Sequence, residues 1–259
     1  MILKIQNFIN AKFIDKDFKQ LISGSAVVFV AKIIATLLGL IFNLFVARIY
    51  GEESIGILAL VNSFLAIALI PSLFGLQTSI LRFIPEYIKK ASFFEAVHIY
   101  KRSLAIVFTF SIIISIVTFF NAEFIADYIF KKPELSMIFS VAAIFIVFKS
   151  IEGFNQSALR AFKDIKFFAL LSILVPVLNI LALIILNYLT KDIYNPVFAI
   201  LITSVIICLL TFIFLKETIH QNRTNQFFSK KILGIKKILT ISTPMFLTSV
   251  MGVIITQTD

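Results

Sequence analysis

Long apolar runs separated by short polar connections dominate the chain. The first run, residues 21–47, holds a single lysine, Lys32, and the second occupies residues 55–81. A helix needs about 20 apolar residues to cross a bilayer core, so both runs predict membrane-spanning helices. The later runs occupy residues 103–120, 135–159, 167–189 and 195–215, with a last one from about residue 241. The pattern predicts an all-α polytopic membrane helix bundle with six complete transmembrane helices and a truncated seventh.

The same pattern divides the chain into four segments. Residues 1–20 place apolar side chains at helical spacing among lysines, which predicts a cytoplasmic amphipathic helix on the membrane surface. Residues 21–216 form the predicted six-helix transmembrane lobe. Residues 217–240 are a basic cytoplasmic linker, and residues 241–259 are the expected start of a second lobe.

Lysine and arginine alternate in density between successive connections. The N-terminal segment and the even-numbered connections hold 18 of these residues, whereas the odd-numbered connections hold 4. Basic residues are retained on the cytoplasmic side of a membrane. We therefore expect a cytoplasmic N-terminus and a multi-pass protein of the inner, cytoplasmic membrane. The regular alternation also supports the number of predicted spans.

Composition agrees with a membrane protein. The chain is 59% hydrophobic and 15% charged, whereas soluble domains are about 45–50% apolar and about 25% charged. The net charge of +10 would suggest nucleic acid in a soluble protein, but the positive-inside pattern accounts for it without such a partner. One cysteine, Cys208, and two distant histidines predict no disulfide, metal site or cofactor.

A polar stripe follows the first run. At about 100° per residue, Ser25, Lys32, Thr36, Gly39 and Asn43 share one sector of a helix. A lysine at mid-span costs about 2.5–3.5 kcal/mol unless it faces protein or water. Small polar residues cannot neutralise an ammonium group, so the stripe predicts that this helix lines a polar cavity. A partner acid on another helix is the alternative.

Three further runs carry polar side chains on one face, and a cavity between the four helices would collect them. The candidate cavity residues are Lys32, Asn43, Thr78, Arg82, Lys149, Glu152, Gln156 and Asn179. Pro71, Gly75 and Pro176 are candidate hinges, since proline and glycine permit bends.

Simpler roles remain open for each group. Serine, threonine, glycine and asparagine commonly hold membrane helices together. Lys149 and Glu152, three residues apart, can form a structural ion pair, and Arg82 can extend to the membrane interface. If the cavity exists, it is net positive and suits an anionic solute. The acids of the loop at 121–134, Glu123, Asp127 and Glu134, are too scattered to predict an enzyme.

Several short motifs occur in order along the chain. They are Ser-Gly-Ser-Ala at 23–26, Ala-Arg-Ile-Tyr-Gly at 47–51, Ile-Gly at 55–56, Gly-Leu-Gln-Thr-Ser-Ile-Leu-Arg-Phe at 75–83 and Gln-Ser-Ala-Leu-Arg-Ala-Phe-Lys at 156–163. Together they resemble the polysaccharide-biosynthesis flippases, the Wzx-type (O-antigen) members of the multidrug/oligosaccharidyl-lipid/polysaccharide exporter superfamily.

The resemblance implies two lobes of about six helices around a cavity that opens alternately to each side of the membrane. It implies transport, for surface polysaccharide biosynthesis, of a polyprenyl-pyrophosphate-linked oligosaccharide to the outer leaflet. The head would occupy the cavity, near Lys32, Arg82 and Lys149, and the tail would stay in the lipid bilayer. Glycan polymerase or ligase proteins are expected partners. The chain stops within the first helix of the second lobe, which suggests a fragment unless two copies pair.

Two other functions are alternatives. A drug or cation antiporter of the same superfamily would need an acid in the first span, where Lys32 stands. A half-length chain also suits a non-transporting subunit of a polysaccharide assembly complex.

Overall fold

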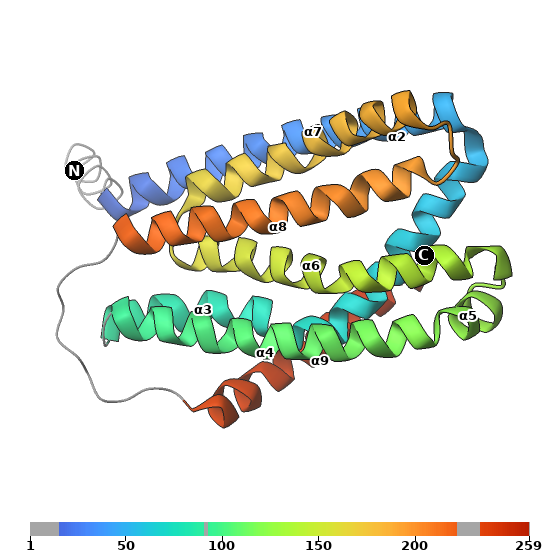
Figure 1. Ribbon diagram of the computed structural model, residues 1–259. Coiled ribbons are helices and arrows are strands. Elements are labelled where there is room, and N and C mark those ends of the chain that lie inside the picture. Colours follow the sequence, from blue (N-terminus) through green and yellow to red (C-terminus); the bar gives the residue numbers. More distant parts are fainter. Residues whose placement is uncertain (1–15, 91–92, 222–233, 259) are drawn as a thin grey trace, which may run out of the picture.

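The computed structural model describes residues 16–90, 93–221 and 234–258, and in these parts the protein is an all-helical bundle without strands (Figure 1). Within them, five helices are long and apolar enough to cross a membrane. They are α2 (Lys16–Leu73), α4 (Phe93–Phe120), α6 (Ser136–Ala161), α7 (Ile165–Leu189) and α8 (Asn195–Gln221). The prediction of an all-α membrane bundle is confirmed.

The long helix α2 is two helices joined at Gly51. This glycine has φ 81° and ψ −177°, a conformation that only glycine adopts readily. The arms at 16–50 and 52–73 run in different directions (Figure 1). At 1.5 Å per residue, even the second arm is about 33 Å long, close to the thickness of a bilayer core.

The bend is held by hydrogen bonds to the connection between α7 and α8. The Ser54 hydroxyl donates to the carbonyl of Ile193 at 2.6 Å, and the Tyr50 hydroxyl donates to Oδ1 of Asn187 at 3.2 Å. Asn195 donates in turn to the Tyr50 oxygen at 3.3 Å. These bonds place the bend and the α7–α8 connection at the same end of the bundle.

The second predicted span ends earlier than the sequence indicated. The prediction of one helix over residues 55–81 is wrong, because α2 ends at Leu73 and a separate helix, α3 (Leu76–Lys90), follows. Phe74 and Gly75 between them have φ 44° and φ 67°, in the left-handed region that interrupts a helix. Helix α4 begins at Phe93, ten residues before the apolar run at 103–120.

The predicted loop at 121–134 contains short helical turns. They are α5 (Ala122–Phe124), the π-turn η1 (Ile125–Ile129) and the 3-10 turn η2 (Pro133–Leu135). Ala122, Ala126 and Leu135 are buried, so apolar packing orders this segment. Most of the predicted amphipathic segment at 1–20 and the middle half of the basic linker at 217–240 lie outside the described residues.

Helix α6 runs through the middle of the bundle and joins two apolar clusters. Phe154, Ala158 and Leu159 belong to the cluster near the start of α7, whereas Phe139 and Ile146 belong to the one near the bend of α2. The last helix, α9 (Ile235–Thr258), packs against α3, α2 and α4. The segment of α6 between the two clusters holds the charged residues of the candidate site.

Candidate functional site

The midpoint of α6 carries a compact group of polar side chains. Lys149 Nζ lies 3.1 Å from Glu152 Oε2, and Gln156 Nε2 donates to Glu152 Oε1 at 3.2 Å. The lysine side chain is 21% exposed and the glutamate side chain 8%. Both carboxylate oxygens therefore have donors, which offsets part of the cost of placing this charge among apolar helices.

The start of α3 reaches the same level of α6. A Cβ built on Gly153 would lie 4.0 Å from Oε1 of Gln77, an ordinary contact distance, so the Gln77 amide lies beside this part of α6. Gln77 of α3 thus lies beside Gly153, the residue that follows Glu152 in α6. The break at residues 74–75 brings α3 to this position, and a continuous second span would have followed another path.

The polar residues of α3 divide between two faces. Thr78 and Arg82 are exposed, whereas Ser79 is buried and its hydroxyl donates to the Gly75 carbonyl at 3.1 Å. Arg82 has Glu86 at 4.0 Å, with side chains 69% and 36% exposed. An exposed pair at this distance contributes little to stability, but it places an acid beside a predicted anion-binding residue.

The stripe on α2 is open to its surroundings. Lys32 and Asn43 are exposed, and a Cβ built on Gly39 would have nothing within 4 Å of it. The Thr36 hydroxyl donates to the Lys32 carbonyl at 2.9 Å, so this hydroxyl has its hydrogen-bond acceptor within the helix. Among the described side chains no acid lies within ion-pair distance of Lys32.

The polar residues of α7 point into packed regions. Asn187 accepts from Tyr50, and Pro176 is buried within a helix that continues through it. Oδ1 of Asn179 is buried and has no hydrogen-bond partner within the described part of the chain. The structure thus groups Lys149, Glu152 and Gln156. In the described regions it shows no hydrogen bond or ion pair from this group to Lys32, Asn43, Thr78, Arg82 or Asn179.

Two groups of hydrogen-bonded polar residues were not predicted from the sequence. The Tyr100 hydroxyl donates to Oδ1 of Asn155 at 3.0 Å, and Nδ2 of Asn155 donates to Thr211 Oγ1 at 3.1 Å, which joins α4, α6 and α8. No sequence signal links these three residues. Asp164 caps α7 by accepting from the amide of Phe167 at 3.3 Å. A carboxylate directly before an apolar run is a recognisable capping signal.

Among the described residues, no cluster of three or more histidine, cysteine or acidic side chains could hold a metal ion. Searches of curated proteins and of solved structures returned no match to this chain. A family model described as "Polysaccharide biosynthesis protein" matches residues 21–259, which is nearly the whole chain. With its several apolar helices, the protein is a multi-pass membrane protein. The chain belongs to the polysaccharide biosynthesis protein family, the family of the Wzx-type flippases and exporters.

Proposed function

We propose that the protein is a flippase that moves a polyprenyl-pyrophosphate-linked oligosaccharide from the cytoplasmic to the outer leaflet. The observation that carries the proposal is the exposed Lys32 in the first arm of α2, in a chain of this family. An exposed ammonium within an apolar helix needs water or an anion as its counterpart. A pyrophosphate or an acidic sugar would supply that anion.

The arrangement of α2 supports a role at an interface. It is the least buried of the candidate spans, and its first arm exposes large apolar side chains along its length. The Lys32 stripe lies on one flank of this arm. In the proposed transporter this flank faces the second lobe across a central cavity, and alternating access exposes Lys32 to each side in turn. Lys149, paired with Glu152, is a secondary anion site.

The proposed topology has six complete spans and the start of a seventh, with the N-terminus in the cytoplasm. The two arms of α2 are the first two spans, and α3 extends the second. Figure 1 supports this order, because α4, α6, α7 and α8 run in alternating directions along the bundle. The expected partners are the lipid-linked oligosaccharide, the bilayer, and glycan polymerase or ligase proteins of the same process.

The test uses the complete gene product in a strain whose surface polysaccharide depends on it. Lys32→Ala is expected to abolish surface glycan and to accumulate lipid-linked oligosaccharide, with an unchanged amount of protein in the membrane. Lys32→Arg should retain export, and Lys191→Ala, which removes an exposed lysine from the α7–α8 connection, should behave as wild type. Normal export by the Lys32→Ala variant would contradict the proposal.

A loss of glycan without accumulated lipid-linked oligosaccharide would indicate a defect in synthesis or assembly, as expected for a non-transporting subunit. Drug sensitivity that changes with Lys32→Ala while glycan stays normal would favour an antiporter. The three functions therefore give three different outcomes in one strain.

A further inference from the structure

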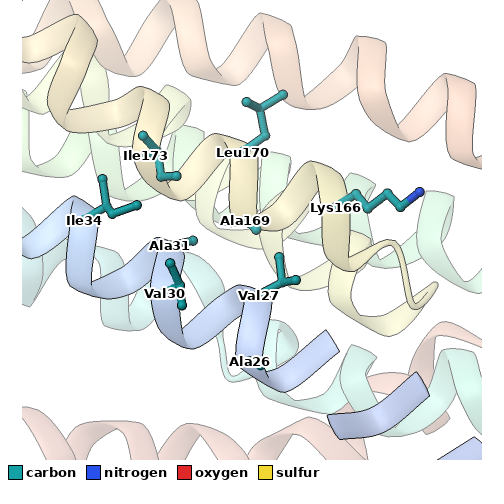
Figure 2. Close-up of a pocket in the computed structure, with 9 residues that line it drawn as sticks. All are labelled: Ala26, Val27, Val30, Ala31, Ile34, Lys166, Ala169, Leu170 and Ile173. Carbon is teal, nitrogen blue, oxygen red and sulfur yellow. The ribbon is translucent and has the colours of Figure 1, made fainter. Parts of the chain in front are cut away.

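A groove of about 520 Å³ runs between α2 and α7 (Figure 2). Its lining is apolar except for one lysine. The lining residues are Ala26, Val27, Val30, Ala31, Ile34, Lys166, Ala169, Leu170 and Ile173.

Small residues along the contact between the helices create this groove. Ala31 is 3% exposed and Ala169 is 5% exposed, and they form its floor. Val30, Ile34 and Leu170 beside them are 54%, 39% and 48% exposed. A larger residue at either alanine would close the space, so the groove exists because small side chains lie at the contact between α2 and α7.

The groove has the length of one lipid leaflet. Its α2 lining extends from Ala26 to Ile34, about 12 Å along the helix at 1.5 Å per residue. Half of a bilayer core is about 15 Å thick. A groove this long and this apolar fits one acyl chain, which would bury methylene groups that otherwise meet only mobile lipid.

Lys166 supplies a cation at one end of the groove (Figure 2). It is exposed and lies in the first turn of α7. Within the described side chains no carboxylate lies within ion-pair distance of it. A lysine stem can lie along apolar surface while its ammonium reaches the headgroup layer. The combination of an acyl-length groove and a terminal cation complements a lipid with an anionic headgroup.

The groove lies away from the Lys32 stripe. At about 100° per residue, Val30 and Ile34 are on one side of Ala31, and Lys32 and Thr36 are on the other. An occupant of the groove would therefore not share a face of α2 with a substrate held by Lys32. This separation favours a bilayer lipid over the tail of the transported molecule.

We infer that the α2–α7 groove binds an anionic glycerophospholipid, with one acyl chain against Ala31 and Ala169 and the phosphate at Lys166. The bound lipid fills the seam between the two helices. Lipid binding in the groove needs only membrane insertion, whereas the choice of a bilayer lipid over a transported tail rests on the proposed role of Lys32.

The experiment uses the complete protein in nanodiscs of phosphatidylcholine that contain phosphatidylglycerol with a photoreactive acyl chain. After illumination, labelled peptides are quantified by mass spectrometry. Labelling should concentrate on Val27, Val30 and Ile173, and should exceed that of Ile184 and Ile185, which are exposed apolar residues farther along α7. Equal labelling at both places would overturn the inference.

Two variants distinguish the contribution of the Lys166 charge to lipid binding from that of the apolar groove. Lys166→Gln should lower phosphatidylglycerol labelling in the groove about fivefold, the effect of one lysine near an anionic headgroup, and should leave photoreactive phosphatidylcholine labelling unchanged. Val30→Phe, at an exposed position, should lower labelling by both lipids. Lys163→Gln removes a nearby exposed lysine that does not line the groove, and should have no effect.

Two further outcomes would also overturn the inference. An equal loss in Lys163→Gln would show a general effect of surface charge. If photoreactive polyprenyl phosphate labels the groove in preference to phosphatidylglycerol, the groove belongs to a polyprenyl chain instead.

Discussion

Gly75 lies directly against the backbone of Ser242. A Cβ built on Gly75 would lie 2.7 Å from the Ser242 carbonyl oxygen and would also overlap the backbone of α9 at Met245 and Phe246. Phe74 beside it stacks between Phe110 of α4 and Phe246 of α9, with ring centroids 5.2 Å and 5.0 Å apart. The break between α2 and α3 is therefore also the place where α9 docks on the bundle.

Gly75→Ala should destabilise the protein. Alanine disfavours φ 67°, at a cost of about 1–3 kcal/mol, and its methyl group would meet backbone that has little freedom to move. The expected result is a lower melting temperature in detergent and less protein in the membrane. Gly56→Ala is the control, because Gly56 is helical and has nothing within 4 Å of its Cβ position. It should be neutral or slightly stabilising. An unchanged melting temperature for Gly75→Ala would contradict the packing described above.

Substitutions in the Lys149–Glu152 pair should distinguish a role in stability from a role in transport. Lys149→Met leaves a mostly buried carboxylate without its cation and should lower the melting temperature. The cost should stay below the ~3–5 kcal/mol of a fully buried pair, because the lysine side chain is 21% exposed. The double variant Lys149→Met, Glu152→Gln removes both charges and should regain most of the stability.

Export by the same double variant then identifies the role of Lys149. A purely structural pair predicts that export returns with stability. An anion-binding lysine predicts a stable protein that still exports poorly, which is the result we expect from the proposed function. A double variant no more stable than the single one would show that the two charges do not compensate each other.

Asp164→Ala should loosen the turn between α6 and α7. Asp164 accepts from the amide of Phe167, and its other oxygen accepts from the Thr218 hydroxyl at 2.7 Å, which ties this turn to α8. Loss of a helix cap and a partly buried hydrogen bond should cost about 1–3 kcal/mol, measured as a lower melting temperature. The matched control is Asp192→Ala, since Asp192 accepts from the Tyr194 amide in an exposed turn. Equal losses in the two variants would contradict the role of Asp164.

Tyr100 and Asn155 should be energetically coupled through their hydrogen bond. A double-mutant cycle with Tyr100→Phe and Asn155→Leu isolates this one interaction. Hydrogen bonds between membrane helices average about 0.6 kcal/mol and reach about 1.7 kcal/mol, and we expect a value in this range from thermal unfolding. Tyr128→Phe, at a side chain 73% exposed, is the control. Additive effects of the two changes would show that the bond contributes nothing.

The proposed topology predicts opposite labelling of two introduced cysteines. Lys163→Cys should react with a membrane-impermeant maleimide only in opened cells, whereas Lys191→Cys should react in intact cells whose outer surface is accessible. Both positions are exposed, and native Cys208 is buried and should stay unlabelled. Labelling of both cysteines from the same side would contradict an odd number of crossings between them.

The sequence by itself determined the class of protein and most of its helices. Apolar runs of membrane length identify bilayer-spanning helices because an unsatisfied backbone in lipid is costly, and this holds whatever the neighbours are. The pairing of Lys149 with Glu152 was also predictable, because residues three apart share a helix face. The capping role of Asp164 was also recognisable in the sequence, because a carboxylate directly before an apolar run is a capping signal. Hydrophobic periodicity alone does not reveal it.

Only the tertiary structure decided where the second run breaks and which polar residues meet. The sequence marked Gly75 as a candidate hinge, but the stretch at 55–81 was read as one span, and the end of α2 at Leu73 was not predicted. The left-handed conformation of Gly75 is held by the close approach of α9, more than 160 positions later in the chain. In the same way, Tyr100, Asn155 and Thr211 meet only because three helices pack at one level. Periodicity describes one helix at a time, whereas these contacts depend on how separate helices are placed against one another.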